Sequence, residues 1–498
     1  MAARTADLPM LRRALRDMAA GEKPERRKLV TTYYDTKDRA LAKRGCVLRV
    51  RKHDGRFVQA VKSEGTAGDS PLARGEWEDS VDGDAPDPQA GASGSFLTPD
   101  IAARLAPLFR TEVTRVVAEL EPSPGTRIEA AIDRGEIRAR GKKSAEPISE
   151  IELELKSGAV TSLYDTALQL LAIAPIRLDP RSKAERGSRL AGANGLFGQL
   201  VASVPVALDP EMTAEAALQR IGRACLAQIL RHEAAALEGR VDGVHQMRVA
   251  ARRLRAVLSA FRRILPKRQR LWAQDELRRL ADSLSEVRNL DVFAEGLIGS
   301  AKLAETRRKR LQALVRRRRR AAHAKARLLI GSARFTGPML ELLRWFDGCG
   351  WREGADEDLL QQPIGAAAPD MLDGRLHAVA KAAHDFANQS PGQRHRLRIA
   401  VKKLRYAAEF LAGLYDPAAV RGFVEPLRRL QDDLGNANDV EVGQQIVAAL
   451  AVQGETGRKL AETGQRVLDW HRQRVVRRAD KTAARLDRLS QAEPFWRG

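Results

Sequence analysis

Cysteines, aromatic residues and long apolar runs are all scarce in this sequence of 498 residues. Its three cysteines are odd in number, widely separated and without metal-ligand spacing, which argues against a disulfide framework and against a zinc site. No uncharged apolar run approaches the ~20 residues that a membrane span requires, and the first residues contain no apolar signal core. These absences predict a cytoplasmic protein.

Negative charge is also in deficit. The chain has 86 lysines and arginines against 64 aspartates and glutamates, which gives a formal net charge of +22. Solubility does not require so large an excess of one sign, so the composition predicts a polyanionic partner. Nucleic acid, an anionic membrane surface and a phosphate polymer are the candidates.

A basic motif occurs twice in the second half of the chain. The first copy runs from His245 to Arg255 and the second from His395 to Arg405, 150 residues later (395 minus 245). On a helix the basic residues of each copy fall at i, i+3, i+7 and i+10, which places them on one face, whereas the intervening apolar residues form a core seam. These two cationic stripes consist of His245, Arg248, Arg252 and Arg255, and of His395, Arg398, Lys402 and Arg405.

A second pair of related segments supports a duplication. Leu277-Arg-Arg-Leu280 and Leu427-Arg-Arg-Leu430 keep the 150-residue offset, and each precedes an Asp-Val pair that follows a short turn containing Asn289 or Asn438. Two matching elements in each half predict two copies of one helical module.

The cationic stripes suit a line of phosphates because their charged groups recur about once per helical turn, roughly 5.4 Å apart. Arginine makes bidentate contacts to phosphate oxygens, and histidine can donate hydrogen bonds or become cationic beside a polyanion. The alternative is that the histidines are contacts between two helices and the other residues are ordinary surface charge. Aromatic residues make up only 5% of the chain and none interrupts the stripes, which argues against base stacking. Binding to duplex phosphates stays open.

Residues 29 to about 190 show the alternation of strands rather than helical periodicity. Arg49 and Arg51 alternate on one expected strand, and Glu150, Glu152 and Glu154 share a face of another, because side chains two residues apart point the same way. Cations and carboxylates lining one barrel interior would suit a polyphosphate together with a divalent metal. The alternative is a sheet with a charged solvent face. The expected strands are 47–51, 57–62, 128–132 and 151–155.

The duplicated His-x-x-Arg-x-Ala-x-x-(Arg/Lys)-Leu-Arg pattern resembles the CHAD family, the conserved histidine α-helical domain, over roughly residues 209 to 485. The resemblance implies a helical bundle of two pseudo-symmetric halves whose basic surface binds inorganic polyphosphate. The residues it assigns to that surface are His245, Arg248, Arg252, Arg253, Arg255, His395, Arg398, Lys402, Lys403 and Arg405.

The first part of the chain resembles a CYTH domain of the triphosphate tunnel metalloenzyme class. The segments that carry this resemblance are Tyr33-Tyr34-Asp35-Thr36, 45–51, 59–62, 74–76, 109–115, 128–135, 150–158 and 182–187. The resemblance implies a tunnel that holds a triphosphate and hydrolyses it with Mg²⁺ or Mn²⁺. By position, the phosphate-binding residues would be Arg49, Arg51, Lys62, Arg74, Arg115 and Lys183. The metal-side carboxylates would be Glu76, Asp133, Glu150 and Glu152; Glu78 and Arg186 rank below these sets, and no residue receives a catalytic role.

One departure from that family concerns its opening Glu-x-Glu-x-Lys strand. No such segment precedes Tyr33, and the literal match at Glu152-Leu-Glu154-Leu-Lys156 occupies the place of a later strand. Two interpretations follow: the natural start lies further upstream, or the tunnel lacks its first wall.

We therefore expect an α+β protein with an antiparallel β-tunnel at residues 1–195, a linker at 196–208 and an all-α bundle at 209–490, with repeats at about 209–345 and 365–490. Asp209-Pro210 is the expected start of the first helix. The expected function is inorganic polyphosphate binding on cytoplasmic polyphosphate granules. A metal-dependent inorganic triphosphatase and a general nucleic-acid or polyanion-binding protein are the alternatives.

Overall fold

The computed structural model describes residues 1–19, 23–64, 74–192, 206–451 and 454–497. The chain divides into two compact units, one formed by residues 1–202 and 331–350 and the other by residues 203–330 and 351–498. Most of the expected linker at 196–208 lies outside the described residues. None of the described helices has the length and apolar character that a transmembrane helix needs.

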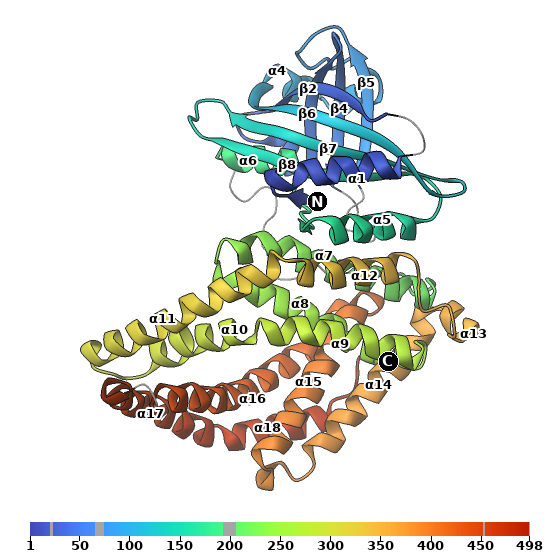
Figure 1. Cartoon of the computed structure of the whole chain (residues 1–498). Helices are drawn as coiled ribbons and strands as arrows, with labels where there is room; N and C mark the ends of the chain where they lie inside the picture. Colours follow the sequence, from blue (N-terminus) through green and yellow to red (C-terminus); the bar gives the residue numbers. More distant parts are fainter. Residues whose placement is uncertain (20–22, 65–73, 193–205, 452–453, 498) are drawn as a thin grey trace. The chain divides into compact units, whose positions relative to one another are not determined.

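The N-terminal unit is built on an antiparallel sheet, as expected (Figure 1). Within the described residues the strand order is β5-β4-β3-β2-β6-β7-β8-β1-β9. The two-residue strand β1, between β8 and β9, was not predicted from the sequence. The strands are β1 (Ala2–Ala3), β2 (Glu25–Asp35), β3 (Cys46–His53), β4 (Arg56–Glu64), β5 (Arg74–Val81), β6 (Ala106–Ser123), β7 (Thr126–Ala139), β8 (Ala145–Ser157) and β9 (Ile176–Arg177).

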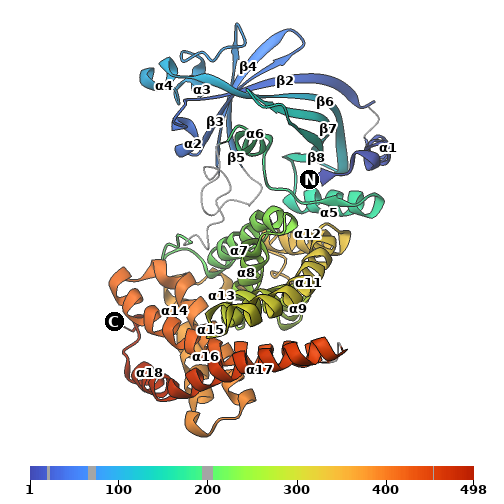
Figure 2. The same ribbon diagram turned by 90° about the vertical axis from the view of Figure 1, so that its left-hand side faces the viewer.

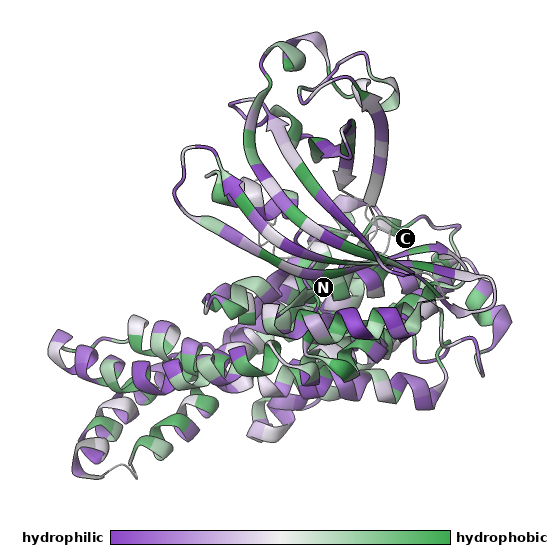
Figure 3. Cartoon of the chain, turned by 45° about the horizontal axis from the view of Figure 1, so that its top comes forward, coloured by the Kyte–Doolittle hydropathy of each residue, from purple (hydrophilic) through white to green (hydrophobic). Residues whose placement is uncertain are grey.

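The two faces of this sheet differ in chemistry, and the alternation along its strands is visible in Figure 3. On β8, Ile151 is buried in a core cluster with Leu11 and Leu15 of α1 (Leu8–Met18) and Leu170 of α5 (Val160–Ile173). The neighbouring Glu150 and Glu152 therefore point to the other, concave face. The same unit contains three short helices, α2 (Ala40–Lys43), α3 (Gly91–Gly94) and α4 (Pro99–Ala103).

Helix α6 (Lys183–Leu190) lies on the concave side of the curved sheet (Figure 2). The hydroxyl of Ser182 caps its first turn by accepting a hydrogen bond from the Glu185 backbone N–H at 3.1 Å. A Cβ on Gly187 would lie 2.2 Å from the ring of Phe109, so glycine allows the helix to approach β6 closely. This packing brings Lys183, at the start of the helix, to the inner face of the sheet.

Helix α12 (Ala333–Asp347) belongs to the N-terminal unit. The guanidinium of Arg344 pairs with Asp165 of α5 at 2.7 Å, and the hydroxyl of Tyr164 donates a hydrogen bond to the carboxylate of Asp347. From its helical periodicity, which is the same as that of the neighbouring segments, this segment was expected in the first helical repeat, at about 209–345. The first unit is therefore assembled from two separate stretches of the chain.

The second unit is helical, and its helices pack in a repeated order. Helix α8 packs against α7 and α9, and α15 packs against α14 and α16, while α8 and α15 contact each other. The helices are α7 (Ala214–Leu237), α8 (Val241–Ala260), α9 (Lys267–Ser283), α10 (Ser285–Asp291), η2 (a π-helix, Val292–Ile298), α11 (Glu305–Ile330), α13 (Glu357–Gln361), α14 (Ile364–Ala383), α15 (Pro391–Leu411), α16 (Pro417–Ala451), α17 (Gly454–Arg477) and α18 (Ala479–Gln491).

The expected core seams of α8 and α15 are confirmed, since Met247 and Leu254 in one copy and Leu397 and Leu404 in the other are fully buried. The expected start of the first helix is wrong. Helix α7 begins at Ala214, and Thr213 caps it by accepting a hydrogen bond from the Ala216 N–H at 3.1 Å.

Asp209 instead closes a tight turn by accepting a hydrogen bond from the Glu211 N–H at 2.9 Å. An aspartate before a proline suits a tight turn as well as the start of a helix. Both Asp209 and Thr213 were therefore possible capping residues for the first helix. Only the structure shows that Thr213 is the one used.

Candidate functional site

The concave face of the N-terminal sheet lines a cavity of about 490 Å³, here called the tunnel cavity. Its lining includes nearly all of the residues that the sequence assigned to a triphosphate or a metal: Arg49, Arg51, Lys62, Glu76, Arg115, Asp133, Glu150, Glu152 and Lys183. The backbone of Arg74 pairs with Glu64 at the start of β5, but its side chain lies outside the described part of the chain.

Strand register accounts for this gathering. Arg115 on β6, Asp133 on β7 and Glu150 on β8 are directly opposite one another across three neighbouring strands. Lys62 on β4 is likewise opposite Glu76 on β5. Because cross-strand partners share a face of the sheet, each set of charges converges on the cavity from a different wall.

Three carboxylates form a compact group, here called the carboxylate group. Asp133, Glu150 and Glu152 each offer an oxygen, and these oxygens lie within 4.8 Å of one another. The ammonium of Lys183 lies among them, 2.7 Å from Asp133 Oδ2 and 2.8 Å from Glu152 Oε1, and it also contacts Glu150. The Lys183 ammonium, a cationic group, therefore already lies between these three carboxylates. Hard oxygen ligands of this kind are what Mg²⁺ and Mn²⁺ prefer, so the residues fit a divalent cation.

The remaining predicted metal ligand, Glu76, lies apart from the carboxylate group. Its carboxylate pairs with Arg49 at 2.6 Å and with Lys62 at 2.8 Å. Glu78, ranked lower from the sequence, is 3.4 Å from the same Arg49 guanidinium. Arg186, also ranked lower, pairs with Glu146 at 2.7 Å and with Glu150 at 3.0 Å. Glu76 therefore neutralises Arg49 and Lys62, whereas Arg186 helps to hold Glu150 in place.

The charges in the tunnel cavity strongly influence one another. Burial alone would raise the pKa of Glu152, yet Lys183 and Arg115 hold that pKa well below its usual value. Burial would lower the pKa of Lys183, but Glu152, Glu150 and Asp133 raise it above its usual value. Arg115 contacts Glu152 and donates to Asp133 at 2.7 Å. Glu152 is therefore ionised and Lys183 charged at neutral pH.

Arg51 differs from its neighbours. It has no ion pair among the described residues, and its Nε is buried without a hydrogen-bond partner. Burial and the neighbouring Arg49 lower its pKa. A half-buried guanidinium without an ion pair is costly, so Arg51 is available to an anion in the tunnel cavity.

Arg181 was not predicted from the sequence, yet it lines the tunnel cavity and pairs with Asp179 at 2.9 Å. Both residues precede Ser182, the cap of α6. Their position beside Lys183 was a signal that could have found them.

In the helical unit, the two cationic stripes lie on the adjacent helices α8 and α15. Arg248, Arg252 and Arg255 on α8 and Arg398 and Lys402 on α15 are half-buried and have no ion pair among the described residues. Burial and the neighbouring Arg398 and Arg252 lower the pKa of Lys402 to about 7. Positive charges that lower one another's pKa in this way would be stabilised by an anion.

The histidines of the two stripes differ. Burial, together with Arg288 and Arg252, lowers the pKa of His245 to about 4, so this ring is neutral at neutral pH. His395 is exposed, and its Nδ1 lies 3.1 Å from the side-chain oxygen of Asn438. The same oxygen accepts a hydrogen bond from Arg398 at 2.9 Å.

Two of the residues predicted to bind polyphosphate are already engaged by other side chains. Arg253 is only 6% exposed, and its guanidinium lies 4.4 Å from the ring centroid of Phe410. It follows Arg252 directly and so points about 100° around the helix, toward the core. Arg405 is neutralised by Glu409 and donates to Gln431 at 2.9 Å.

Lys403 faces a different group of basic residues. Burial and the charges of Arg375, Arg255, Arg262 and Arg270 lower its pKa. Arg375 is buried and donates a hydrogen bond to the backbone carbonyl of Ser259. Arg262, Arg270 and Arg375 lie outside the duplicated motif, so no sequence pattern pointed to them.

Arg288 of α10 was also missed. Burial lowers its pKa, and both Asp439 and Arg252 are close enough to influence it. It lies beside Asn289, in the segment that matches Asn438 of the other half. The repeat therefore marked the position, but no side-chain role had been assigned to it.

Comparison with known families supports both parts of this description. Residues 6–188 match the family model of the CYTH domain, and residues 220–448 match that of the CHAD domain. The chain thus combines a CYTH domain with a CHAD domain, and both expected resemblances are confirmed.

Individual relatives agree with these matches. The chain is 33% identical over 162 residues to the inorganic triphosphatase of Haemophilus influenzae, a match that covers 32% of this chain and 45% of that protein. It therefore spans less than half of that relative's length. The crystal structure of the CHAD domain from Ricinus communis is 27% identical, covers 57% of this chain and 95% of its own, and superposes with a TM-score of 0.50.

Proposed function

We propose that the tunnel cavity binds inorganic triphosphate and hydrolyses its terminal phosphoryl group with a divalent cation. The observation that carries this proposal is the carboxylate group, which lies in one cavity with Arg49, Arg51, Lys62, Arg115 and Lys183. The relative from Haemophilus influenzae, named as an inorganic triphosphatase, supports the same substrate.

The basic residues would bind and orient the substrate. Arg51, without an ion pair in the described part of the chain, would meet the anion first, together with Arg49 and Lys62 on the neighbouring part of the wall. Arg115 and Lys183 would exchange carboxylate contacts for phosphate oxygens as the anion enters. Arginine suits this role because its planar group can contact two phosphate oxygens at once.

Hydrolysis would proceed by attack of water on the terminal phosphorus, with cleavage of its bond to the bridging oxygen and loss of a proton from the water. The positive charges of Arg115 and Lys183 would stabilise the negative charge that grows on the transferring group. Asp133, Glu150 and Glu152 would hold a divalent cation, which supplies further positive charge and lowers the pKa of bound water. No side-chain nucleophile is required.

This proposal predicts that the protein releases phosphate from inorganic triphosphate when Mg²⁺ or Mn²⁺ is added. Excess chelator should reduce the rate to background, because the carboxylate group would lose its cation. Release of phosphate can be followed by a colorimetric assay, with the same chelator titrated back by each metal in turn. Properly folded protein that binds triphosphate but releases no phosphate with either metal would leave a binding cavity only.

We further propose that the helical unit binds inorganic polyphosphate along the cationic stripes. The specific observation is that half-buried cations from both halves, among them Arg252 and Lys402, adjoin one another without ion pairs in the described ranges. Association with polyphosphate granules would follow from such binding. Because duplex DNA also presents a line of phosphates, a general polyanion-binding surface is the competing proposal.

Polyphosphate binding should weaken as the pH rises above 7. The free Lys402 has a pKa of about 7, lowered by burial and by Arg398 and Arg252 against the weaker opposing charge of Asp439. A bound polyanion would raise that pKa, so binding takes up a proton above pH 7 and affinity falls by up to about tenfold per pH unit. His245, with a pKa of about 4, does not titrate in this range.

Titrations with long-chain polyphosphate at pH 6.5, 7.5 and 8.5 and constant ionic strength would measure this slope. The Lys402→Arg variant keeps its charge throughout, so its affinity should stay nearly constant over the same range. An equal slope in both proteins would show that Lys402 does not contact the polymer.

A further inference from the structure

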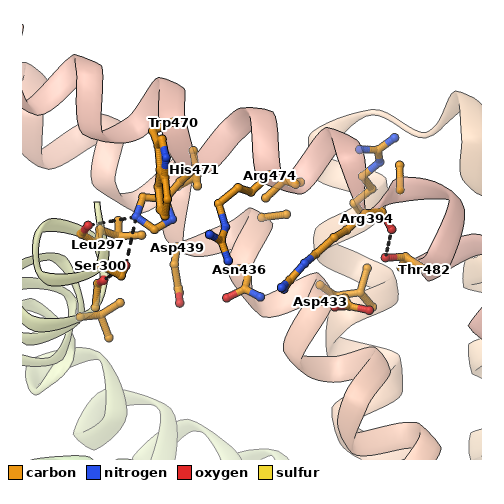
Figure 4. Close-up of a pocket in the computed structure, with 18 of the residues that line it drawn as sticks. Leu297, Ser300, Arg394, Asp433, Asn436, Asp439, Trp470, His471, Arg474 and Thr482 are labelled. Carbon is orange, nitrogen blue, oxygen red and sulfur yellow. Dashed lines mark hydrogen bonds between the residues drawn. The ribbon is translucent and has the colours of Figure 1, made fainter. Parts of the chain in front are cut away.

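The helical unit contains a second cavity, of about 290 Å³, here called the arginine cavity. It lies among η2, the middle of α16, α17 and the start of α18, and Arg394 reaches it from the beginning of α15 (Figure 4). None of the residues proposed to contact polyphosphate lines it. It has therefore no role in the functions proposed above.

Two arginines that line this cavity contact aromatic rings rather than carboxylates. The guanidinium of Arg474 lies 4.6 Å from the ring centroid of Trp470, and that of Arg394 lies 5.2 Å from the ring centroid of Phe386. Neither arginine has an ion pair among the described residues, and Arg394 Nε is buried without a partner. Figure 4 shows both guanidinium groups reaching toward Asn436. Stacking on a ring fixes a guanidinium without neutralising it.

The two carboxylates of the cavity are engaged elsewhere. Asp433 forms an ion pair with Arg485 of α18. Asp439 lies close to the charges of Arg398 and Lys402, on the side of the cationic stripes. The centre of the cavity is therefore positive, and an anionic group would find two prepositioned guanidiniums there.

Much of the remaining lining is apolar, although Ser300, Arg478 and Thr482 also contribute to it. Leu297, Val440 and Val475 contribute side chains to it. The ring of His471 is held at its edge, with Nε2 3.0 Å from the Leu297 carbonyl oxygen. The volume is close to the lower end of the roughly 300–1,000 Å³ range of small-molecule sites. A bare phosphate chain would leave this apolar surface without a partner.

We propose that the arginine cavity binds a nucleotide. Arg394 and Arg474 would hold its phosphates, with the Asn436 amide N–H donating a hydrogen bond to a phosphate oxygen, and the apolar side chains would cover the base and the sugar. A nucleotide combines an anionic end with a flat, largely apolar end that carries a few hydrogen-bonding groups, which is the chemistry that this lining offers.

The test uses the full chain and ADP carrying a fluorescent methylanthraniloyl group. Binding is followed by energy transfer from tryptophan, counting only the signal that the Trp470→Phe variant loses. This restriction limits the signal to label bound within energy-transfer distance of Trp470. Unlabelled ADP and pyrophosphate then compete, because pyrophosphate has the same phosphates without the nucleoside.

ADP should displace the label at concentrations at least tenfold lower than pyrophosphate. The Arg394→Ala/Arg474→Ala double variant should bind at least tenfold more weakly, since both phosphate contacts are lost. Arg472→Ala is the matched control: Arg472 is on the same helix, two residues from Arg474, and pairs with Asp469 at 2.7 Å. Its affinity should match that of the unmodified protein within twofold.

Equal potency of pyrophosphate and ADP would overturn the proposal, because the site would then recognise phosphate alone. A double variant that binds labelled ADP as well as the unmodified protein would overturn it as well. Circular dichroism of the double variant, and its binding to long-chain polyphosphate, would show that the helical unit remains folded.

Discussion

Replacement of Glu152 by glutamine should lower the kcat for triphosphate hydrolysis by about 100-fold or more, the size of effect seen when one preorganised electrostatic group is removed from an active site. The change removes one charge from the carboxylate group and the counter-charge of Lys183 and Arg115. Both the divalent cation and the two basic residues would then be held less well. A higher metal concentration should be needed for half-maximal rate, which a titration with Mg²⁺ or Mn²⁺ would measure.

Glu136→Gln is the matched control for this experiment. Glu136 is on β7, three residues from Asp133, and pairs with Arg138 outside the tunnel cavity. Its variant should keep the rate and metal dependence of the unmodified protein. If Glu152→Gln retained both, the carboxylate group would not hold the metal that the reaction uses.

Charge reversal at the meeting point of the two stripes should have the second large effect. The Arg252→Glu/Lys402→Glu variant should bind long-chain polyphosphate at least ~100-fold more weakly in moderate salt, because two attractions become repulsions and two counterion-releasing contacts are lost. The slope of log affinity against log salt should also become shallower by about 1 to 2. Both quantities come from binding titrations at several salt concentrations.

An equal change in total charge in the N-terminal unit provides the control. Arg13 and Arg16 are exposed on α1 of the N-terminal unit, and each lies within 4 Å of Asp17. Their double reversal should leave polyphosphate affinity nearly unchanged. Unchanged retention by the Arg252→Glu/Lys402→Glu variant would contradict the site. Ready displacement of the polymer by duplex DNA at matched phosphate concentration would favour a general polyanion surface.

Periodicity in the sequence predicted the parts of this protein that depend on local repetition. The two-residue alternation around Glu152 placed its carboxylate on the inner face of the sheet, and the helical spacing of His245, Arg248 and Arg252 placed them on one face of α8. These predictions hold because strands and helices fix the direction of successive side chains.

Contacts between residues that are far apart in the sequence could not be predicted from this periodicity. Nothing near Arg253 in the sequence indicates that Phe410, more than 150 residues away, covers it. The same holds for Glu76, which pairs with Arg49 and Lys62 rather than joining the other carboxylates. Charge pattern identifies which residues can bind an ion, whereas packing decides which of them remain available.

The assignment of α12 to the N-terminal unit has a consequence for the autonomy of the two domains. The chain leaves the first unit, builds much of the second, returns to supply α12 beside α5, and then completes the second. No single cut separates such interleaved domains: a fragment ending at residue 192 loses the partners of Asp165 and Tyr164, and a fragment beginning at 206 carries α12 without α5. The N-terminal unit and the helical unit therefore cannot be exchanged one at a time for other domains without rebuilding the contacts between α12 and α5.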